Sequence, residues 1–312
     1  MIVVSTRSGL VEAEHPVIGV AMDAAGTVIA TLGGDDVDRE FFMRSAAKPF
    51  QATVAQRSGA GLGIEQLAMA SASHGGQPVH VALVRDMLAG VGLEEHHLVC
   101  PPDRPSSLSA DRLWAGMGHL APERVFHNCS GKHGAMLRAC VASDWSLEYA
   151  APDHPLQREI GEFVAEVTSR PVGPVGVDGC GIPTLRTDVT GLARAFARLV
   201  TDPDLRPVAE ADARFGALTS DGERPEATLT RWFPGPVKGG ALGCIGAGWL
   251  EGGIGFATKC WSGQPAPAVV GLVTLMDRVG ILPHHPKEML EELLAPAMLG
   301  GGRPVGHLEA AP

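Results

Sequence analysis

The sequence has no run of basic residues, and its charge balance is acidic. Lysine and arginine total 25, against 35 aspartate and glutamate residues, which gives a formal net charge of −10. Nucleic-acid phosphates and anionic lipid headgroups both attract positively charged surfaces. The charge balance therefore argues against a nucleic-acid-binding protein and against a protein that binds an anionic membrane.

Long apolar stretches are missing as well. A membrane-spanning helix needs about 20 consecutive, mostly apolar residues, and no segment of the sequence approaches that length. Residues 1–7 also lack the charged start and the apolar core of a signal peptide. We therefore expect a cytoplasmic protein, in which cysteines stay reduced.

No C-x-x-C pair occurs, although the chain has six cysteines: Cys100, Cys129, Cys140, Cys180, Cys244 and Cys260. In a reducing compartment these are expected to be thiols or metal ligands. Aromatic residues make up only 5% of the chain, but 45% of its 312 residues are hydrophobic. That is enough to bury a substantial core in one large domain or in two intimate ones.

The apolar residues follow strand-like patterns near both ends of the chain. Residues 17–22 and 27–32 predict a hairpin around a turn that contains Gly26, and residues 241–247 and 253–259 predict a second pair of strands. The long middle of the chain predicts helices, at about 45–57, 64–71, 78–91, 108–116, 133–143, 155–168 and 187–200, and a closing helix follows at about 266–280.

This order predicts an α+β fold whose antiparallel sheet is built from both chain ends. We expect a sheet lobe formed by about residues 1–44 and 238–290, and a helical lobe formed by about 45–237. The tail from Leu299 carries Gly300-Gly301-Gly302 and is expected to be mobile.

Ser45 and Lys48 stand three residues apart where a helix is predicted to begin. Residues at this spacing share a helix face, so the hydroxyl and the amine can lie close together. A serine hydroxyl becomes a good nucleophile when a neighbouring base takes its proton, and a lysine can be that base when burial or a nearby cation lowers its pKa. The S-x-x-K spacing is typical of penicillin-recognising enzymes. Many surface helices carry the same pair by chance.

A polar loop occupies residues 127–134, His127-Asn128-Cys129-Ser130-Gly131-Lys132-His133-Gly134, and runs into the start of a helix. Backbone amides at a helix start favour anions and thiolates. A second cysteine, Cys180, stands between two glycines close to Asp178. Cys129, Lys132, His133 and Cys180 together suggest a small metal site, with zinc as the metal that thiolates prefer. An ordinary helix cap with a buried cysteine is the alternative.

Two further segments complete a possible serine site. Ser73 and His74 follow an apolar helix and precede Gly75-Gly76, and Lys238-Gly239-Gly240 opens a predicted strand. A lysine followed by glycine at a strand start is similar to the K-T-G element of β-lactamases. Taken alone, Lys238 would be interpreted as a solvated lysine.

These segments together resemble the asparaginase-II family, the rhizobial-type or class 3 L-asparaginases. The resemblance also includes Gly9-Leu10-Val11-Glu12-Ala13-Glu14-His15, Asp153-His154-Pro155-Leu156-Gln157 and Val177-Asp178-Gly179-Cys180-Gly181-Ile182-Pro183-Thr184, and the motifs follow the family's order over nearly the whole chain. It implies one catalytic domain over residues 1–312, with a fold like that of serine β-lactamases and glutaminases.

The resemblance also implies an activity and a site. Members hydrolyse L-asparagine to L-aspartate and ammonia, and they are homodimers. Carried over, one Ser-Lys tandem is Ser45 with Lys48 and the other is Ser73 with Lys238, and a zinc ion is held by Cys129, Lys132 and Cys180. A lysine binds a metal only as the neutral amine, so Lys132 would need a strongly lowered pKa. Arg44, Asp178 and His133 are the expected substrate-binding residues.

The sequence departs from the family pattern at residues 218–225, where the family often has a His-Pro-Glu motif, and at Gly75-Gly76. These departures leave the core chemistry in place and bear on substrate preference. Three alternatives remain open. The chain could be a glutaminase or another small-amide hydrolase, a penicillin-interacting serine enzyme, or a non-enzymatic binding module stabilised by zinc.

Overall fold

The computed structural model of the chain describes residues 1–34, 36–220, 224–282 and 287–311. It has an α+β fold, as the sequence predicts. The main strands are β1 (Ile2–Arg7), β2 (Leu10–Asp23), β3 (Val28–Leu32), β8 (Val237–Gly240), β9 (Cys244–Trp249), β10 (Ile254–Cys260), β11 (Ala297–Gly300) and β12 (Arg303–Ala310). Short two-residue strands are β4 (Phe41–Phe42), β5 (Gly176–Val177), β6 (Pro183–Thr184) and β7 (Arg186–Thr187).

The helices lie mainly in the middle of the chain. The α-helices are α1 (Lys48–Ala55), α2 (Ile64–Ser71), α3 (Pro78–Ala89), α4 (Leu108–Gly116), α5 (Ser130–Ala142), α6 (Pro155–Thr168), α7 (Val189–Thr201), α8 (Arg206–Arg214), α9 (Gly216–Thr219), α10 (Ala227–Trp232), α11 (Pro265–Arg278) and α12 (Lys287–Leu294). Short 3₁₀ or π turns are η1 (Asp36–Asp38), η2 (Arg44–Ala47), η3 (Gln56–Ala60), η4 (Glu95–His97) and η5 (Arg124–Phe126).

The main sheet joins the two ends of the chain. Its strand order is β11-β12-β1-β2-β10-β9-β8, with β3 also paired to β2, and its pairs are antiparallel. The prediction of a sheet built from both chain ends is therefore confirmed. The prediction of a mobile tail is wrong, because Gly301 and Gly302 form the left-handed turn of the β11–β12 hairpin and β12 pairs with β1.

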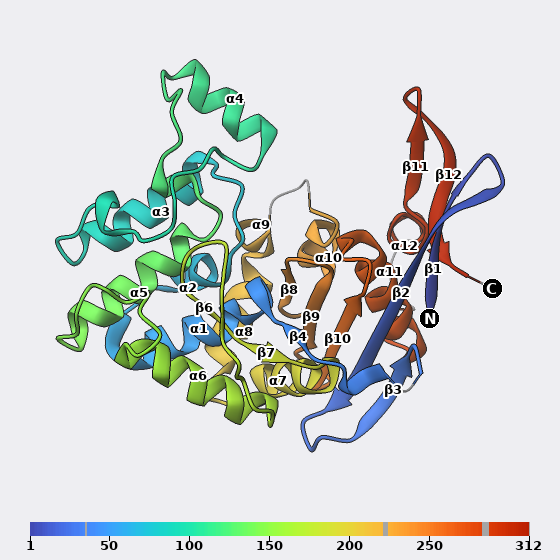
Figure 1. Ribbon diagram of the computed structural model, residues 1–312, viewed down its shortest axis with the longest axis horizontal. Coiled ribbons are helices and arrows are strands. Elements are labelled where there is room, and N and C mark those ends of the chain that lie inside the picture. Colours follow the sequence, from blue (N-terminus) through green and yellow to red (C-terminus); the bar gives the residue numbers. More distant parts are fainter. Residues whose placement is uncertain (35, 221–223, 283–286, 312) are drawn as a thin grey trace.

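Helices cover both faces of this sheet. Ile18, Val20 and Met22 of β2 belong to the core that includes α7 and the helical middle of the chain. Val17 and Ala21 point to the other face, into the core that includes α11. Figure 1 shows α1–α6 gathered on one side of the sheet strands, with the β11–β12 hairpin at the opposite end of the molecule.

Helix α7 packs very closely on the sheet because glycines of β9 and β10 face it. A Cβ on Gly255 would lie 1.9 Å from the carbonyl oxygen of Ala193, and one on Gly246 would lie 2.1 Å from the ring of Phe196. Phe196 in turn packs edge-on against Phe50 of α1, with ring centroids 5.5 Å apart. The sheet thus fixes α7, and α7 fixes the helix that begins with Lys48.

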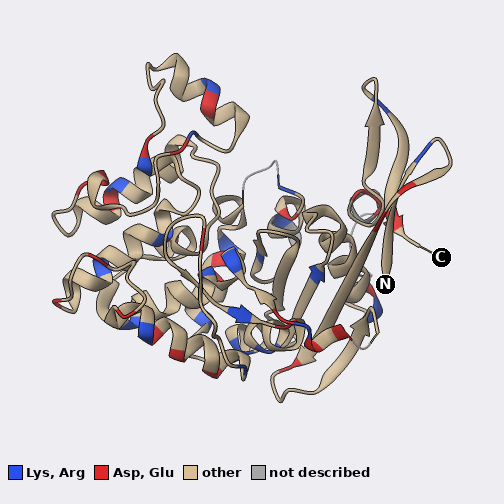
Figure 2. Ribbon diagram, viewed as in Figure 1, with Lys and Arg blue, Asp and Glu red and all other residues tan. Residues whose placement is uncertain are grey.

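Charged side chains of both signs are interspersed along α3, α4 and α6 (Figure 2), as expected of solvated helix faces. Within the described ranges, no helix combines the length and the apolar composition that crossing a membrane requires.

Candidate active site

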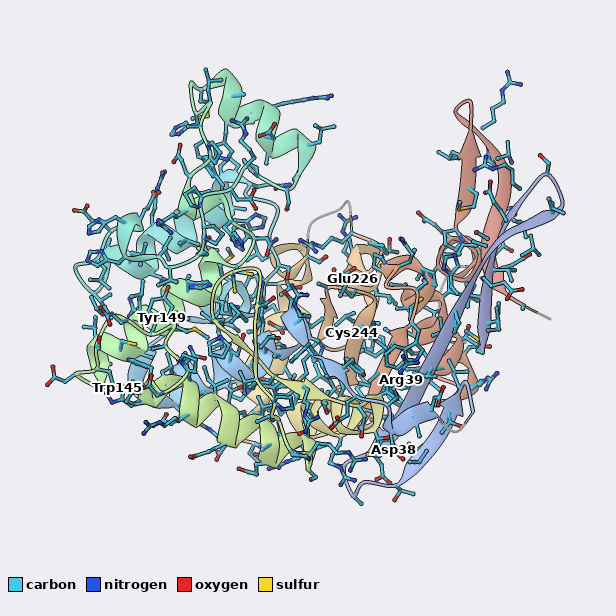
Figure 3. All side chains as sticks on the ribbon, viewed as in Figure 1. Asp38, Arg39, Trp145, Tyr149, Glu226 and Cys244 are labelled. Atoms are coloured by element: carbon cyan, nitrogen blue, oxygen red, sulfur yellow. The ribbon has the colours of Figure 1, made fainter. Side chains whose placement is uncertain are left out.

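A cavity of about 290 Å³ lies where the helical middle of the chain meets the sheet. Its walls come from η2, from the loops that carry Asn128 and Asp178, from the segment before α10 and from the β8–β9 turn. Figure 3 labels Glu226 and Cys244, two of its lining residues, at the centre of the molecule. Of the residues predicted from sequence, the cavity is lined by Arg44, Ser45, Ser73, Cys129, Asp178 and Cys180.

Arg44 and Ser45 lie on η2, a 3₁₀ turn, and the α-helix predicted from residue 45 begins only at Lys48. Arg44 has a φ of 49°, a left-handed conformation that is uncommon for residues other than glycine. Its Nε donates to Asp178 Oδ1 at 2.6 Å. Strained backbone persists where surrounding contacts hold it, and such positions cluster at functional sites.

The amine of Lys48 is fully buried beneath the cavity. Its Nζ donates to the carbonyl oxygens of Ala72 at 2.5 Å and Asn128 at 3.2 Å, and lies 3.0 Å from Ser73 Oγ. Burial is the main cause that lowers the pKa of Lys48. The sequence pairs Lys48 with Ser45, but among the described residues no side-chain hydrogen bond joins these two, because the side chain of Lys48 reaches from α1 to the end of α2 instead. They are linked through the backbone N–H of Lys48, which donates to the carbonyl of Ser45.

The ammonium form of Lys48 can donate to all three oxygens, Ala72 O, Asn128 O and Ser73 Oγ, and the neutral amine fits the same three contacts. Such an amine has two N–H groups and one lone pair. The two N–H groups can donate to the carbonyls of Ala72 and Asn128, which leaves the lone pair for the hydroxyl hydrogen of Ser73. In this state Lys48 is a proton acceptor for Ser73.

Lys238 on β8 is a second buried lysine next to the first. Burial, with the positive charges of Lys48 and Arg224, lowers its pKa to about 7, and the carboxylate of Glu226 acts in the opposite direction. Its Nζ donates to the carbonyl of Gly239 at 2.8 Å. No hydrogen bond within the described residues joins Lys238 to Ser73, so these two do not form the predicted pair by direct contact. Instead Lys48 contacts Ser73, and Lys238 lies close enough to Lys48 for their charges to interact.

The glycines after Lys238 let β8 lie close to two other segments, the backbone that leads into η2 and the segment that carries Glu226. A Cβ on Gly240 would lie 2.5 Å from the carbonyl oxygen of Met43, and one on Gly239 would lie 2.3 Å from Glu226 Oε1. A side chain at position 240 would therefore push β8 away from the backbone before η2, and one at position 239 would displace the carboxylate of Glu226. The Lys-Gly-Gly sequence is thus explained by close packing at the cavity wall.

Glu226 is a cavity residue that our sequence analysis missed. Its side chain is only 5% exposed and faces Gly239. The signal was present, because Arg224-Pro225-Glu226 retains the last two residues of His-Pro-Glu, with arginine in place of histidine. Residues 221–223 of the departing segment lie outside the described residues.

The predicted metal ligands lie together at the cavity, whose wall includes Cys129 and Cys180. Lys132 Nζ is 3.2 Å from Cys180 Sγ, and the side chains of Cys129, Lys132 and Cys180 are all buried. A hydrogen bond with Cys180, helped by the charges of Lys48 and Lys132, holds the pKa of Cys129 well below its usual value. Burial lowers the pKa of Lys132, but the cysteines Cys180 and Cys129 outweigh it and the net effect is a raised pKa. This is opposite to the lowered pKa that metal binding by Lys132 requires, so a metal would have to displace a proton there.

The donor set fits a metal only if the lysine takes part. Within the described residues, no three His, Cys, Asp or Glu side chains are grouped so that they could hold an ion. The two cysteines and the amine of Lys132 would thus be the protein ligands, with the fourth position open.

His133 and His74 are buried, and neither lines the cavity. His133 Nδ1 lies 2.7 Å from the hydroxyl of Tyr149, while its Nε2 has no hydrogen-bond partner in the described part of the chain. His74 Nδ1 accepts from the backbone N–H of Gly76, so its Nε2 carries the hydrogen that is donated to Ser130 Oγ at 2.9 Å. His74 therefore fixes the backbone that follows Ser73, and it is His127 that lines the cavity.

Comparison with known proteins supports a single family. No curated protein has significant similarity to the chain. Among solved structures, a β-lactamase from Mycobacterium bovis is 16% identical with a TM-score of 0.43, and a protein from Bacteroides dorei predicted to be a β-lactamase is 16% identical with a TM-score of 0.47. Each likeness covers 85% of this chain and 93% of the other. A model of the L-asparaginase II family matches residues 3–310, and the chain therefore belongs to that family.

Proposed function

We propose that this chain is an L-asparaginase, which hydrolyses the side-chain amide of L-asparagine to L-aspartate and ammonia. The observation that carries the proposal is the contact between Lys48 Nζ and Ser73 Oγ, beneath a cavity whose wall also presents Ser45. Amide hydrolysis by a serine needs a hydroxyl and a base that is neutral at working pH. Burial supplies such a base by lowering the pKa of Lys48.

We assign Ser45 as the nucleophile and Ser73 as the proton relay. As Ser45 Oγ attacks, its proton passes to Ser73 Oγ while Ser73 gives its own proton to Lys48. Attack by Ser45 Oγ on the amide carbon forms a tetrahedral intermediate, and backbone N–H groups at the start of η2 would stabilise its oxyanion. The carbon–nitrogen bond then breaks as Lys48 returns the proton through Ser73 to the leaving nitrogen, which departs as ammonia. A water molecule activated by the same base hydrolyses the acyl-serine and releases aspartate.

Lys238 supports this chemistry through its charge. Two cations in one buried site repel each other, so at least one of them loses its proton near neutral pH. The pKa of Lys238, lowered to about 7, agrees with that expectation. Lys48 and Lys238 would thus share one proton during the reaction.

Arg44 and Asp178 would bind the amino-acid end of the substrate. The carboxylate of Asp178 is a suitable partner for the α-ammonium group, and the guanidinium of Arg44 is suited to the α-carboxylate. Their mutual hydrogen bond of 2.6 Å would hold both groups ready at the cavity wall.

Cys129, Lys132 and Cys180 would hold a zinc ion, which when bound would supply a Lewis acid with an open coordination position at the cavity wall. In that position it would tie the loop before α5 to the loop that carries Asp178. The family resemblance also leads us to expect a homodimer, which light scattering on the purified protein would test.

The function is tested by measuring ammonia release from L-asparagine and L-glutamine, together with hydrolysis of nitrocefin. Turnover of asparagine supports the proposal. Faster turnover of glutamine would make the chain a glutaminase, since one methylene gives only about 1–3 kcal/mol of discrimination. Turnover of nitrocefin alone would identify a penicillin-interacting enzyme, and no turnover of any substrate would overturn the proposal.

A further inference from the structure

Two residues of the cavity wall have a backbone conformation that is rare outside glycine. Arg44 has a φ of 49° and Leu242 a φ of 61°, and both line the cavity. The left-handed conformation is sterically unfavourable for an L-residue, so each position needs contacts that hold it. Asp178 holds Arg44.

Lys259 is the residue that holds Leu242. It lies on β10 opposite Cys244 of β9 and is largely buried. Its Nζ donates a short hydrogen bond to the carbonyl oxygen of Leu242 and another, of 3.1 Å, to that of Cys260. The buried amine thus connects the body of the sheet to the β8–β9 turn.

Aromatic side chains fix the position of the Lys259 amine. Its Nζ lies 5.2 Å from the ring centroid of Trp261 and 5.9 Å from that of Phe41. The two rings pack edge-on against each other, and the guanidinium of Arg39, labelled in Figure 3, covers Trp261 at 3.7 Å. Contacts between cations and ring faces of this kind are attractive, so the amine is held where it meets the carbonyl of Leu242.

The turn held by Lys259 is part of the cavity wall. Gly240, Ala241, Leu242 and Cys244 all line the cavity, while the side chain of Leu242 is 64% exposed. Burial of the leucine side chain therefore does not explain its strained backbone. Two hydrogen bonds fasten the turn to β10: the one from Lys259 to the carbonyl of Leu242, and one of 2.7 Å from the backbone N–H of Cys260 to the carbonyl of Gly243. A shift of this turn would move several lining residues together.

We propose that Lys259 is a positioning residue for substrate binding: by holding the Leu242 carbonyl it keeps the 241–243 turn in the shape that completes the cavity. This inference rests on the proposed amide hydrolysis. Among the described residues, no hydrogen bond joins Lys259 to Ser45 or Ser73, or to Lys48 or Lys238. Lys259 therefore acts on the substrate through the 241–243 turn.

The test compares Lys259→Met with Lys259→Arg. Methionine reaches as far as the Cε of lysine and loses the donor, so KM for asparagine should rise about tenfold or more while kcat changes little. Arginine keeps a donor that can reach a carbonyl and should recover much of the affinity. A fall in kcat at unchanged KM, or equal effects of both variants, would overturn the proposal.

A double-mutant cycle with Leu242→Gly separates positioning from general stability. Glycine adopts the left-handed conformation without strain, so Lys259→Met should raise KM much less in the Leu242→Gly background than in the wild type. Equal effects of Lys259→Met in both backgrounds would mean that Lys259 does not act through Leu242.

Hydrogen exchange gives a readout that does not depend on activity. The amides of residues 242–244 should exchange faster in Lys259→Met than in the wild type, while those of α7 stay unchanged. If Lys259→Met exchanges faster but the wild-type protein hydrolyses no amide, Lys259 fixes the turn and the proposed function is rejected. If exchange is unchanged in Lys259→Met and the wild type is active, only the role of Lys259 in fixing the turn is rejected.

Discussion

Lys48 Nζ lies 3.0 Å from the hydroxyl of Ser73, a residue 25 positions further along the chain, although Ser45 is only three positions away. The base is therefore connected to the serine at the end of α2, and both serines line the same cavity. This relationship makes the two hydroxyls distinguishable by experiment.

Ser45→Ala should lower kcat for asparagine by about a thousandfold or more, because the nucleophile is lost, whereas Ser73→Ala should cost about a hundredfold through slower proton transfer. Both variants should fold, since removing a hydroxyl leaves little cavity. Ammonia release measures the effect, and Ser58→Ala, which removes a hydroxyl bonded to Val54 at 2.9 Å, is the matched control. A larger loss in Ser73→Ala than in Ser45→Ala would transfer the nucleophile role to Ser73.

Purified protein should contain about one zinc ion per chain, held by two cysteines and a lysine. Elemental mass spectrometry should find this stoichiometry in the wild type and a sharp loss in Cys180→Ala. Cys140→Ala is the control, because Cys140 is a buried thiol on the same helix as Lys132. Zinc that remained in a variant lacking both Cys129 and Cys180 would contradict the assigned site.

Activity should rise with pH, with an ascending limb of log kcat/KM near the pKa of about 7 that the structure gives to Lys238. The active form needs one neutral lysine, so protonation of the pair at low pH removes activity. Lys238→Met removes one of two neighbouring cations, and the remaining lysine should then keep its proton to higher pH. The ascending limb of log kcat/KM should therefore move to higher pH in that variant.

Exposed Arg206, outside the cavity, supplies the control Arg206→Met, which should leave the limb in place. A wild-type profile that is flat between about pH 6 and pH 10, or a limb that moves downward in Lys238→Met, is incompatible with a shared proton.

Glu226→Gln should move the ascending limb of log kcat/KM to lower pH. The carboxylate of Glu226 raises the pKa of Lys238, so its loss lowers that pKa and the neutral amine persists to lower pH. The shift is measured on the pH profile of kcat/KM, with the exposed residue Glu210 changed to glutamine as control. A shift of the limb to higher pH would mean that Glu226 does not act on Lys238 through its charge.

Much of the fold could be predicted because its signals are local. The helices at 64–71, 108–116 and 155–168 have the predicted bounds, since apolar periodicity and helix-start residues mark them. The ends of the chain were harder. Gly300-Gly301-Gly302 reads as a flexible tail until β12 is seen to pair with β1, almost the whole chain away.

The candidate site shows the same division between local and distant information. The S-x-x-K spacing identified Ser45 and Lys48 as candidates, and the family resemblance added Ser73 and Lys238. The partner of Lys48, however, depends on how α1 packs against the end of α2. Glu226 was missed because its neighbour Arg224 replaces the expected histidine, although its position against Gly239 makes it part of the wall.

The glycine of β8 that touches Met43 has a consequence for how sequence variation in this protein should be interpreted. Gly240 carries no reactive group, yet any side chain there would collide with the carbonyl of Met43 and with Cys244 Sγ, the latter at 2.4 Å. A saturation library scored for activity should therefore show Gly240 to be as intolerant of substitution as the serines. Intolerance in such a map would mark a point of contact between two backbones as readily as it marks a chemical role.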